Sequence, residues 1–189
     1  MFFDQKSFQQ EIMFRRQFID DCLASYLENV DAFPPLIHES MRYAVFNGGK
    51  RLRPMFVIEG ANLAGGNRDQ VVPTACALEM IHSYSLVHDD LPAMDDDDFR
   101  RGKPTCHKVY GEANAILTGD ALLTMAFQLV AQNARVPGVD PLKVLQVIDE
   151  IARAAGSRGM IGGQVVDLEY EGKEVAFEEL KTMHKMKTG

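Results

Sequence analysis

Apolar residues recur at three- and four-residue steps along nearly the whole chain, and this spacing constrains the fold most. The steps are clearest in residues 8–27, 35–47, 69–91 and 112–133. Such spacing is typical of α-helices that bury one face. No stretch alternates apolar and polar residues as a β-hairpin does. We therefore predict an all-α fold, a bundle of long antiparallel helices.

Proline and glycine separate the predicted helices. Pro35 suits the first turn of a helix, and Asn47-Gly48-Gly49 supplies the usual C-terminal end of one. Further helices are predicted over residues 50–63, 139–155 and 175–187, with a loop at 95–108 and a glycine-rich segment at 156–163. A chain of 189 residues is long enough for a real core, and we expect residues 1–189 to form one helical domain.

Composition excludes several classes of protein. The net charge of −7 and the lack of a basic stripe argue against a nucleic-acid partner. We see no segment near the length and apolar content of a membrane span, and the N-terminus lacks the pattern of a secretory signal. Three scattered cysteines, Cys22, Cys76 and Cys106, suggest reduced thiols and a cytoplasmic protein.

An acidic run follows the apolar segment that ends near Val87. Residues 89–98 contain six aspartates, and Arg100 and Arg101 follow them after Phe99. Carboxylates so close together repel one another unless a cation lies among them, and Mg²⁺ prefers carboxylate, water and phosphate oxygens. Arginines beside them suit phosphate oxygens. The alternative of a solvated acidic loop stays open, whereas the glycine and glutamate positions of a calcium-binding EF-hand loop are not matched.

A second conspicuous motif is Gly48-Gly49-Lys50-Arg51-Leu52-Arg53-Pro54. Glycines let the backbone approach an anion, and a helix start adds N–H groups that favour phosphate. The spacing does not match a Walker A loop. A helix start with solvated basic residues is the alternative.

Helical geometry relates three further residues to the acidic run. His82 lies seven positions before Asp89, so both project from one face, and Ser85 lies one turn below Asp89. Asp95 falls on the wrong side of an ideal helix. Because Pro92 removes a backbone donor, we expect an irregular helix end that lets Asp89 and Asp95 converge.

These motifs together resemble the trans-isoprenyl diphosphate synthases, most closely the bacterial short-chain farnesyl diphosphate synthases. The resemblance rests on the glycine-lysine-arginine motif above, on an aspartate motif over 88–95 with two extra residues, and on the segment 100–105. Gly119-Asp120, Gly162-Gly163-Gln164 with Asp167, and Lys187-Thr188-Gly189 follow in the family's order. The resemblance implies the isoprenoid synthase fold, with helices around a central cavity.

The family joins an allylic diphosphate, dimethylallyl or geranyl, to isopentenyl diphosphate, with Mg²⁺ as cofactor. The resemblance implies that Asp89 and Asp95 hold the metal, and that Asp90 assists them. It further implies catalytic roles for Asp89, Asp95, Arg100, Lys187 and Thr188, isopentenyl diphosphate binding by Gly49, Lys50, Arg53, His82 and Arg101, and allylic diphosphate binding by Arg100, Lys187, Thr188 and Gln164. Gln164 and Asp167 could instead fix the glycine-rich segment, and Thr188 could be a helix-end hydroxyl.

The resemblance also bears on the product and the partners. Short-chain bacterial members carry an aromatic residue five positions before the first aspartate, here Tyr84, so Tyr84 with Ser85 is expected to stop chain growth at farnesyl diphosphate. Geranylgeranyl diphosphate is the alternative product, and packing between helices is the alternative role of Tyr84. Family members are typically homodimers, and residues 112–133 are apolar over more of their circumference than one neighbour would bury.

One departure concerns the family's second aspartate-rich motif. No such pattern follows Asp98. We therefore expect the C-terminal part of the fold to be missing, with residues 1–189 a fragment of a longer enzyme whose activity alone is in question. A truncated, non-catalytic partner that binds diphosphates is the other interpretation.

Overall fold

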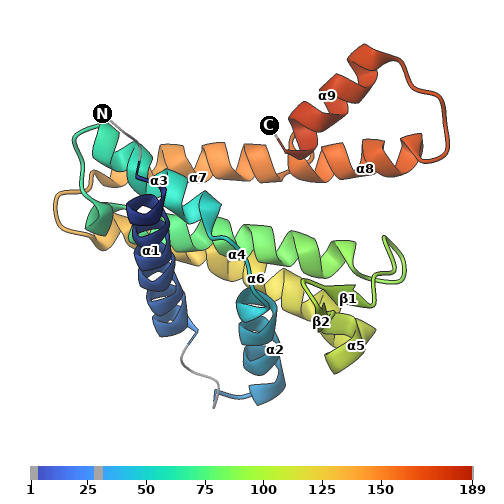
Figure 1. Ribbon diagram of the computed structural model, residues 1–189, viewed down its shortest axis with the longest axis horizontal. Helices are drawn as coiled ribbons and strands as arrows, with labels where there is room; N and C mark the ends of the chain where they lie inside the picture. Colours follow the sequence, from blue (N-terminus) through green and yellow to red (C-terminus); the bar gives the residue numbers. More distant parts are fainter. Residues whose placement is uncertain (1–3, 28–31, 189) are drawn as a thin grey trace. The chain divides into compact units, whose positions relative to one another are not determined.

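The computed structural model describes residues 4–27 and 32–188, and they are helical over most of their length (Figure 1). The chain divides into two compact units, residues 1–139 and 140–189. The elements of the first unit are α1 (Gln5–Tyr26), α2 (Pro35–Phe46), α3 (Leu52–Leu63), η1 (Arg68–Gln70), α4 (Val72–Asp89), β1 (Phe99–Arg100), β2 (Lys103–Pro104), α5 (Cys106–Tyr110), α6 (Glu112–Gln132) and η2 (Asn133–Arg135). The second unit holds α7 (Pro141–Ala155), α8 (Met160–Tyr170) and α9 (Phe177–Lys187). The predicted all-α class is confirmed.

Helix α4 is the centre of the first unit. It packs against α1, α2, α3 and α6, which explains why its sequence is apolar nearly all round. Its antiparallel pairing with α6 is fixed at both ends (Figure 1). Asn133 accepts hydrogen bonds from the backbone N–H and hydroxyl of Thr74 at 3.2 and 3.0 Å, and the imidazole of His88 lies 3.0 Å from the carbonyl oxygen of Ile116.

A close approach of backbones accompanies that second contact. A Cβ added to Gly119 would lie 2.1 Å from Nε2 of His88, so only glycine leaves room for the ring. Glycine at this position therefore sets the distance between α4 and α6 next to the acidic run.

Residues 95–108 differ from the predicted loop. They contain the two-stranded ribbon, in which Phe99 pairs with Pro104 and Arg100 with Lys103, and then the short helix α5. Arg101 and Gly102 form the turn with φ values of 54° and 79°. Positive φ at both central residues is the turn geometry that matches strand twist.

One helix has the length and composition of a membrane span, contrary to the expectation from the sequence. The segment Glu112–Arg135 has a hydropathy of 1.3 in its most apolar window. It packs against α2, α4 and α5, as the core helix of a globular unit does.

Candidate functional site

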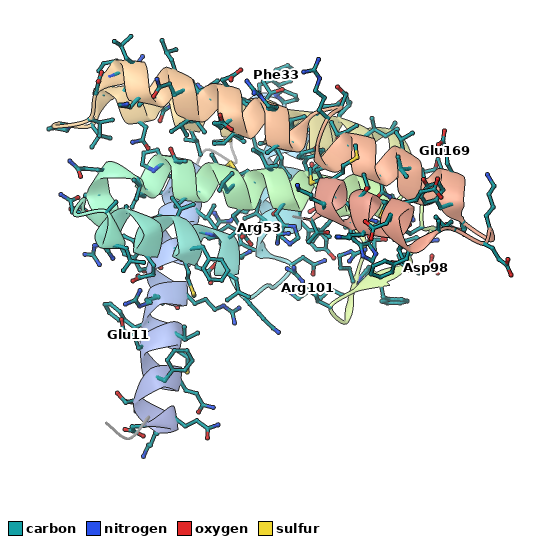
Figure 2. The ribbon with its side chains drawn as sticks, turned by 90° about the horizontal axis from the view of Figure 1, so that it is seen from above. Glu11, Phe33, Arg53, Asp98, Arg101 and Glu169 are labelled. Atoms are coloured by element: carbon teal, nitrogen blue, oxygen red, sulfur yellow. The ribbon has the colours of Figure 1, made fainter. Side chains whose placement is uncertain are left out.

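A cavity of about 530 Å³ lies where the loop between α2 and α3 meets α4 and the ribbon. All five residues that the resemblance assigned to isopentenyl diphosphate line this cavity. Lys103, which was not predicted, adds a further cation. The residues concerned are Gly49, Lys50, Arg53, His82, Arg101 and Lys103. Figure 2 labels Arg53 and Arg101 on this part of the first unit.

Arg101 reaches the glycine loop from the tip of the ribbon. Its guanidinium donates a hydrogen bond to the carbonyl oxygen of Gly48. A Cβ added to Gly49 would lie 2.6 Å from Nη1 of Arg101, and Gly49 has a φ of 132°. Glycine is needed here both for the backbone conformation and for the contact with the arginine. The ribbon that the sequence analysis missed is thus the element that places this cation.

Arg51 differs from its two basic neighbours. Its side chain is 2% exposed and donates to Oδ1 of Asp20 and Oε1 of Glu79, each at 2.7 Å. It also donates to the carbonyl oxygens of Val45 at 2.9 Å and Gly48 at 3.3 Å. Arg51 therefore ties the loop to α1 and α4, although it belongs to the same sequence motif as Lys50 and Arg53. Nothing in the local sequence marks Asp20 and Glu79 as its partners, because they lie far from it along the chain.

Burial and positive charge set the protonation of this cavity. Desolvation, with Arg53 and Arg101 nearby, lowers the pKa of His82 to about 4, so the imidazole is neutral at pH 7. Desolvation also lowers the pKa of Arg101, which remains charged. A region that holds several cations and disfavours one more proton favours a bound anion.

The acidic run folds back on the end of α4. The helix stops at Asp89, and the backbone N–H of Asp95 donates to the carbonyl oxygen of Asp89 at 2.9 Å. The backbone N–H of Asp96 donates to the carbonyl oxygen of Leu91 at 3.1 Å. The predicted irregular helix end is therefore present, and it brings the backbones of Asp89 and Asp95 together. Asp89 is half-buried and Asp95 is exposed.

Asp90 and Arg100 are paired with each other. The Asp90 carboxylate is buried, and its Oδ1 accepts from Nε of Arg100 at 2.6 Å. Arg100 also lies 3.4 Å from Oδ2 of Asp97, and its hydrogen bond to Asp90 raises its pKa. This pair holds the ribbon against α4. Because Asp90 and Arg100 are already paired, Asp90 would have to bind a metal ion in addition to Arg100. Arg100 would likewise have to bind an anion in addition to Asp90.

Tyr84 and Ser85 lie one to two turns before Asp89. Tyr84 is 5% exposed, and its ring packs edge-on against that of His88 with centroids 5.7 Å apart. Its hydroxyl is buried without a hydrogen-bond partner among the described residues. Ser85 donates to the carbonyl oxygen of His82 at 2.9 Å. Burial raises the pKa of Tyr84, so the phenol is neutral.

The remaining predicted residues belong to the second unit. Nζ of Lys187 lies 2.5 Å from Oδ2 of Asp167, which joins α9 to α8. A Cβ added to Gly163 would lie 2.4 Å from the backbone nitrogen of Lys187, so this glycine permits the close approach of the two helices. Gln164 is half-buried and Thr188 is exposed. Asp167 is thus paired with Lys187.

Comparisons with known proteins place these motifs. The profile of the polyprenyl synthetase family matches residues 34–189. Farnesyl diphosphate synthase of Bacillus subtilis is 48% identical over 92% of this chain, and that of Geobacillus stearothermophilus is 46% identical over 98%. Geranylgeranyl pyrophosphate synthase of Catharanthus roseus is 51% identical over 82% of it. The chain spans 58%, 62% and 43% of the lengths of these relatives.

Solved structures agree in fold. A geranyltransferase from Legionella pneumophila superimposes with a TM-score of 0.90 at 38% identity, over 95% of this chain and 63% of that one. An FPP/GFPP synthase from Zymomonas mobilis gives 0.86 at 40% identity, over 97% and 65%. With the family profile matched over residues 34–189, the chain belongs to the polyprenyl synthetase family.

Proposed function

We propose that the protein to which this chain belongs is a prenyltransferase that joins dimethylallyl or geranyl diphosphate to isopentenyl diphosphate and gives farnesyl diphosphate. The observation that carries the proposal is the cationic cavity beside an aspartate-rich helix end. Arg101 lines this cavity and also a smaller hollow together with Asp90 and Arg100. The cations that can bind one diphosphate therefore lie next to carboxylates that can bind a second diphosphate through a metal ion.

Isopentenyl diphosphate is assigned to the cationic cavity. Lys50 and Arg53 are exposed cations that can contact its phosphates, and Arg101 can fork onto phosphate oxygens. Neutral His82 can donate one ring N–H to the same anion. Holding the substrate in one orientation replaces a costly encounter in solution.

The carboxylates at the end of α4 fit Mg²⁺. They offer only oxygen donors, which Mg²⁺ prefers, and the hydrogen bond between Asp95 and Asp89 keeps these two residues adjacent. Asp89 and Asp95 would hold the ion, while Asp90 stays paired with Arg100. When bound, Mg²⁺ neutralises charge on a departing diphosphate.

The family resemblance assigns the allylic diphosphate to Arg100 of the first unit and, separately, to Lys187 of the second. Each is now paired with a carboxylate, Asp90 and Asp167 respectively, so phosphate oxygens would join or replace those partners. Ionisation of the allylic carbon–oxygen bond leaves a cation. The oxygen atoms of Thr188 and Gln164 are candidates to stabilise it.

Product length is assigned to Tyr84, with Ser85 beside it. A buried ring five residues before Asp89, between one and two helical turns away, can block a growing apolar tail. Geranylgeranyl diphosphate stays the alternative product, because geranylgeranyl synthases are as similar to this chain as the farnesyl synthases are. A non-catalytic partner is less favoured, since a protein that only binds diphosphates has no use for metal-binding carboxylates beside the cations.

A homodimer is the proposed assembly. On α6, Ile116 and Leu117 are 45% and 57% exposed, and Val109 on α5 is 46% exposed. These apolar side chains can be covered by a second copy. Light scattering that finds only monomer at high concentration would contradict this assignment.

The experiment is calorimetric binding of a non-hydrolysable diphosphate with and without Mg²⁺. We expect Mg²⁺ to tighten binding and Asp89→Asn to remove that gain, while Arg53→Gln weakens binding in both conditions. Lys6→Gln is the control, because Lys6 lies 14 residues before Asp20 on α1, about 21 Å along the helix. Equal affinity with and without Mg²⁺ would overturn the metal assignment, and an unaffected Arg53→Gln would overturn the cavity.

A further inference from the structure

A second group of metal-ligating side chains lies at the base of the ribbon, and the proposed prenyl transfer does not use it. One carboxylate oxygen each from Asp96 and Asp98 and one ring nitrogen of His107 lie within 4.8 Å of one another. The two aspartates are exposed, and His107 is 6% exposed. Asp98 is labelled in Figure 2. We propose that these three residues bind a divalent transition-metal ion, separately from the Mg²⁺ at Asp89 and Asp95.

The hydrogen bonds of Thr105 fix the tautomer of His107. The Thr105 hydroxyl donates to the carbonyl oxygen of Asp97 at 2.8 Å, so its hydrogen is already used. Nδ1 of His107 lies 3.1 Å from Oγ1 of Thr105 and must therefore be the donor in that contact. Nε2 then carries the lone pair of a neutral imidazole. A histidine that donates through one nitrogen and is free to ligate through the other is the usual arrangement at metal sites.

Nε2 of His107 lacks a partner. It is buried without a hydrogen bond to any of the residues that the structure describes. Burying an acceptor without a hydrogen-bond partner is unfavourable. A metal ion held by Nε2 together with Asp96 and Asp98 would satisfy this nitrogen and would offset the repulsion between the two carboxylates.

The separation of the three groups suits an ion better than direct contact. Within the described parts of the chain, neither a hydrogen bond nor an ion pair joins His107 to Asp96 or Asp98. Ligand atoms around one tetrahedral metal are roughly 3.3 Å apart, because metal–ligand bonds are about 2.0–2.1 Å long. The exposed aspartates can move by this small amount, while the buried imidazole stays in place.

The mixture of ligands selects the class of metal. One imidazole and two carboxylates favour Zn²⁺, Co²⁺, Fe²⁺ or Mn²⁺ over Mg²⁺, which prefers oxygen ligands alone. Three protein ligands also leave a coordination position for water or another oxygen donor.

Lys108 would compete with the metal ion for the carboxylate of Asp98. Its Nζ lies 2.6 Å from Oδ1 of Asp98, and its side chain is 44% exposed. A metal at Asp98 must share or displace this ammonium, and because it is exposed the displacement costs little. Removing the lysine should therefore tighten metal binding only while Asp98 is present.

The test is a Co²⁺ titration of the 189-residue chain without diphosphate, followed by visible absorption and by competition with Zn²⁺. We expect one saturable site with ligand-field bands that Zn²⁺ displaces. Asp98→Asn and Asp96→Asn should each weaken binding roughly tenfold or more. Lys108→Gln should tighten it several-fold, and this gain should vanish in the double variant with Asp98→Asn.

His107→Gln should abolish the bands, and circular dichroism checks that this buried substitution still folds. If it does not fold, the exposed aspartate variants decide. Asp89→Asn separates the two metal sites and should keep the Co²⁺ bands, and Asp149→Asn is the matched control with an exposed carboxylate elsewhere. The proposal is overturned if Co²⁺ does not saturate, or if Asp89→Asn removes the bands while Asp96→Asn and Asp98→Asn leave them unchanged.

Discussion

Replacing Arg51 with methionine should lower the free energy of unfolding far more than the same change at Arg53. The two arginines lie two positions apart in one motif. Arg51 is 2% exposed and paired with Asp20 and Glu79, while Arg53 is exposed in the cationic cavity. Similar sequence contexts thus lead to opposite expectations for stability and for anion binding.

The magnitude follows from what Arg51→Met leaves behind. The Glu79 side chain is 3% exposed, so its carboxylate would be buried without a counterion. Breaking a buried pair in this way costs about 3–5 kcal/mol. Asp20 is 22% exposed and can regain water, so it adds little. We expect a loss of about 4 kcal/mol in the free energy of unfolding, or roughly 8–16 °C in Tm for a chain of this size.

The assay is urea unfolding followed by far-ultraviolet circular dichroism, with diphosphate binding measured in parallel. Arg53→Met should change the free energy of unfolding by less than about 0.5 kcal/mol, as for most exposed positions, yet weaken diphosphate binding. The double variant Arg51→Met with Glu79→Leu should recover most of the lost stability, because an apolar pair can replace a buried ion pair.

Two outcomes would refute this reasoning. The first is a loss of less than about 1 kcal/mol in the free energy of unfolding for Arg51→Met, well under the cost of a broken buried pair. Alternatively, the double variant would be no more stable than Arg51→Met alone. The second result would mean that the unpaired charge of Glu79 is not the cause of the loss.

The remaining predictions each concern one position or a pair of positions. The pKa of His82 is lowered to about 4, and a bound anion raises it. Diphosphate affinity should therefore increase as pH falls from 7 toward 5. In calorimetry, His82→Asn should remove this increase in affinity. Because the pKa of His82 is lowered in the folded protein, its contribution to the free energy of unfolding is complete above about pH 6.5. That contribution is lost as the pH falls toward 4. Gly119→Ala should destabilise by about 1–3 kcal/mol through the clash with His88, whereas Gly60→Ala, which meets nothing within 4 Å, should stabilise slightly in the same urea assay. Tyr84→Ala in the full-length enzyme should lengthen the product, and an unchanged chromatographic profile with activity retained would exclude Tyr84 as the floor.

Helical periodicity predicted most of the fold because it reports burial directly. Helix α4 was expected over 69–91 and spans Val72–Asp89, and α6 was expected over 112–133 and spans Glu112–Gln132. The ends shifted by a few residues because caps and short 3₁₀ turns replace the last helical turns. Apolar spacing carries no information on those local choices.

The ribbon and the start of α8 could not be predicted from local signals. The turn Arg101-Gly102 has positive φ at an arginine, which is uncommon, so the dipeptide does not stand out as Asn-Gly would. Gly162 and Gly163 were assigned only to a glycine-rich segment, yet they lie inside α8, where the approach of α9 leaves no room for a Cβ at Gly163. In both places, contacts between distant residues override local propensity.

At three points of the candidate site, two charged residues that are close in sequence have different structural roles. Arg51 is buried and paired, while Arg53 lines the cavity. Asp90 is buried and paired, while Asp89 is half-buried at the helix end. Arg100 holds Asp90, while Arg101 reaches the glycine loop. A charge that enters the core needs a partner, and that partnership fixes the backbone from which the next charge projects. Successive residues point in different directions, so one motif can supply both the support and the ligand. Motif matching alone therefore cannot separate the two roles, and the stability and binding assays on Arg51 and Arg53 are the direct way to do so.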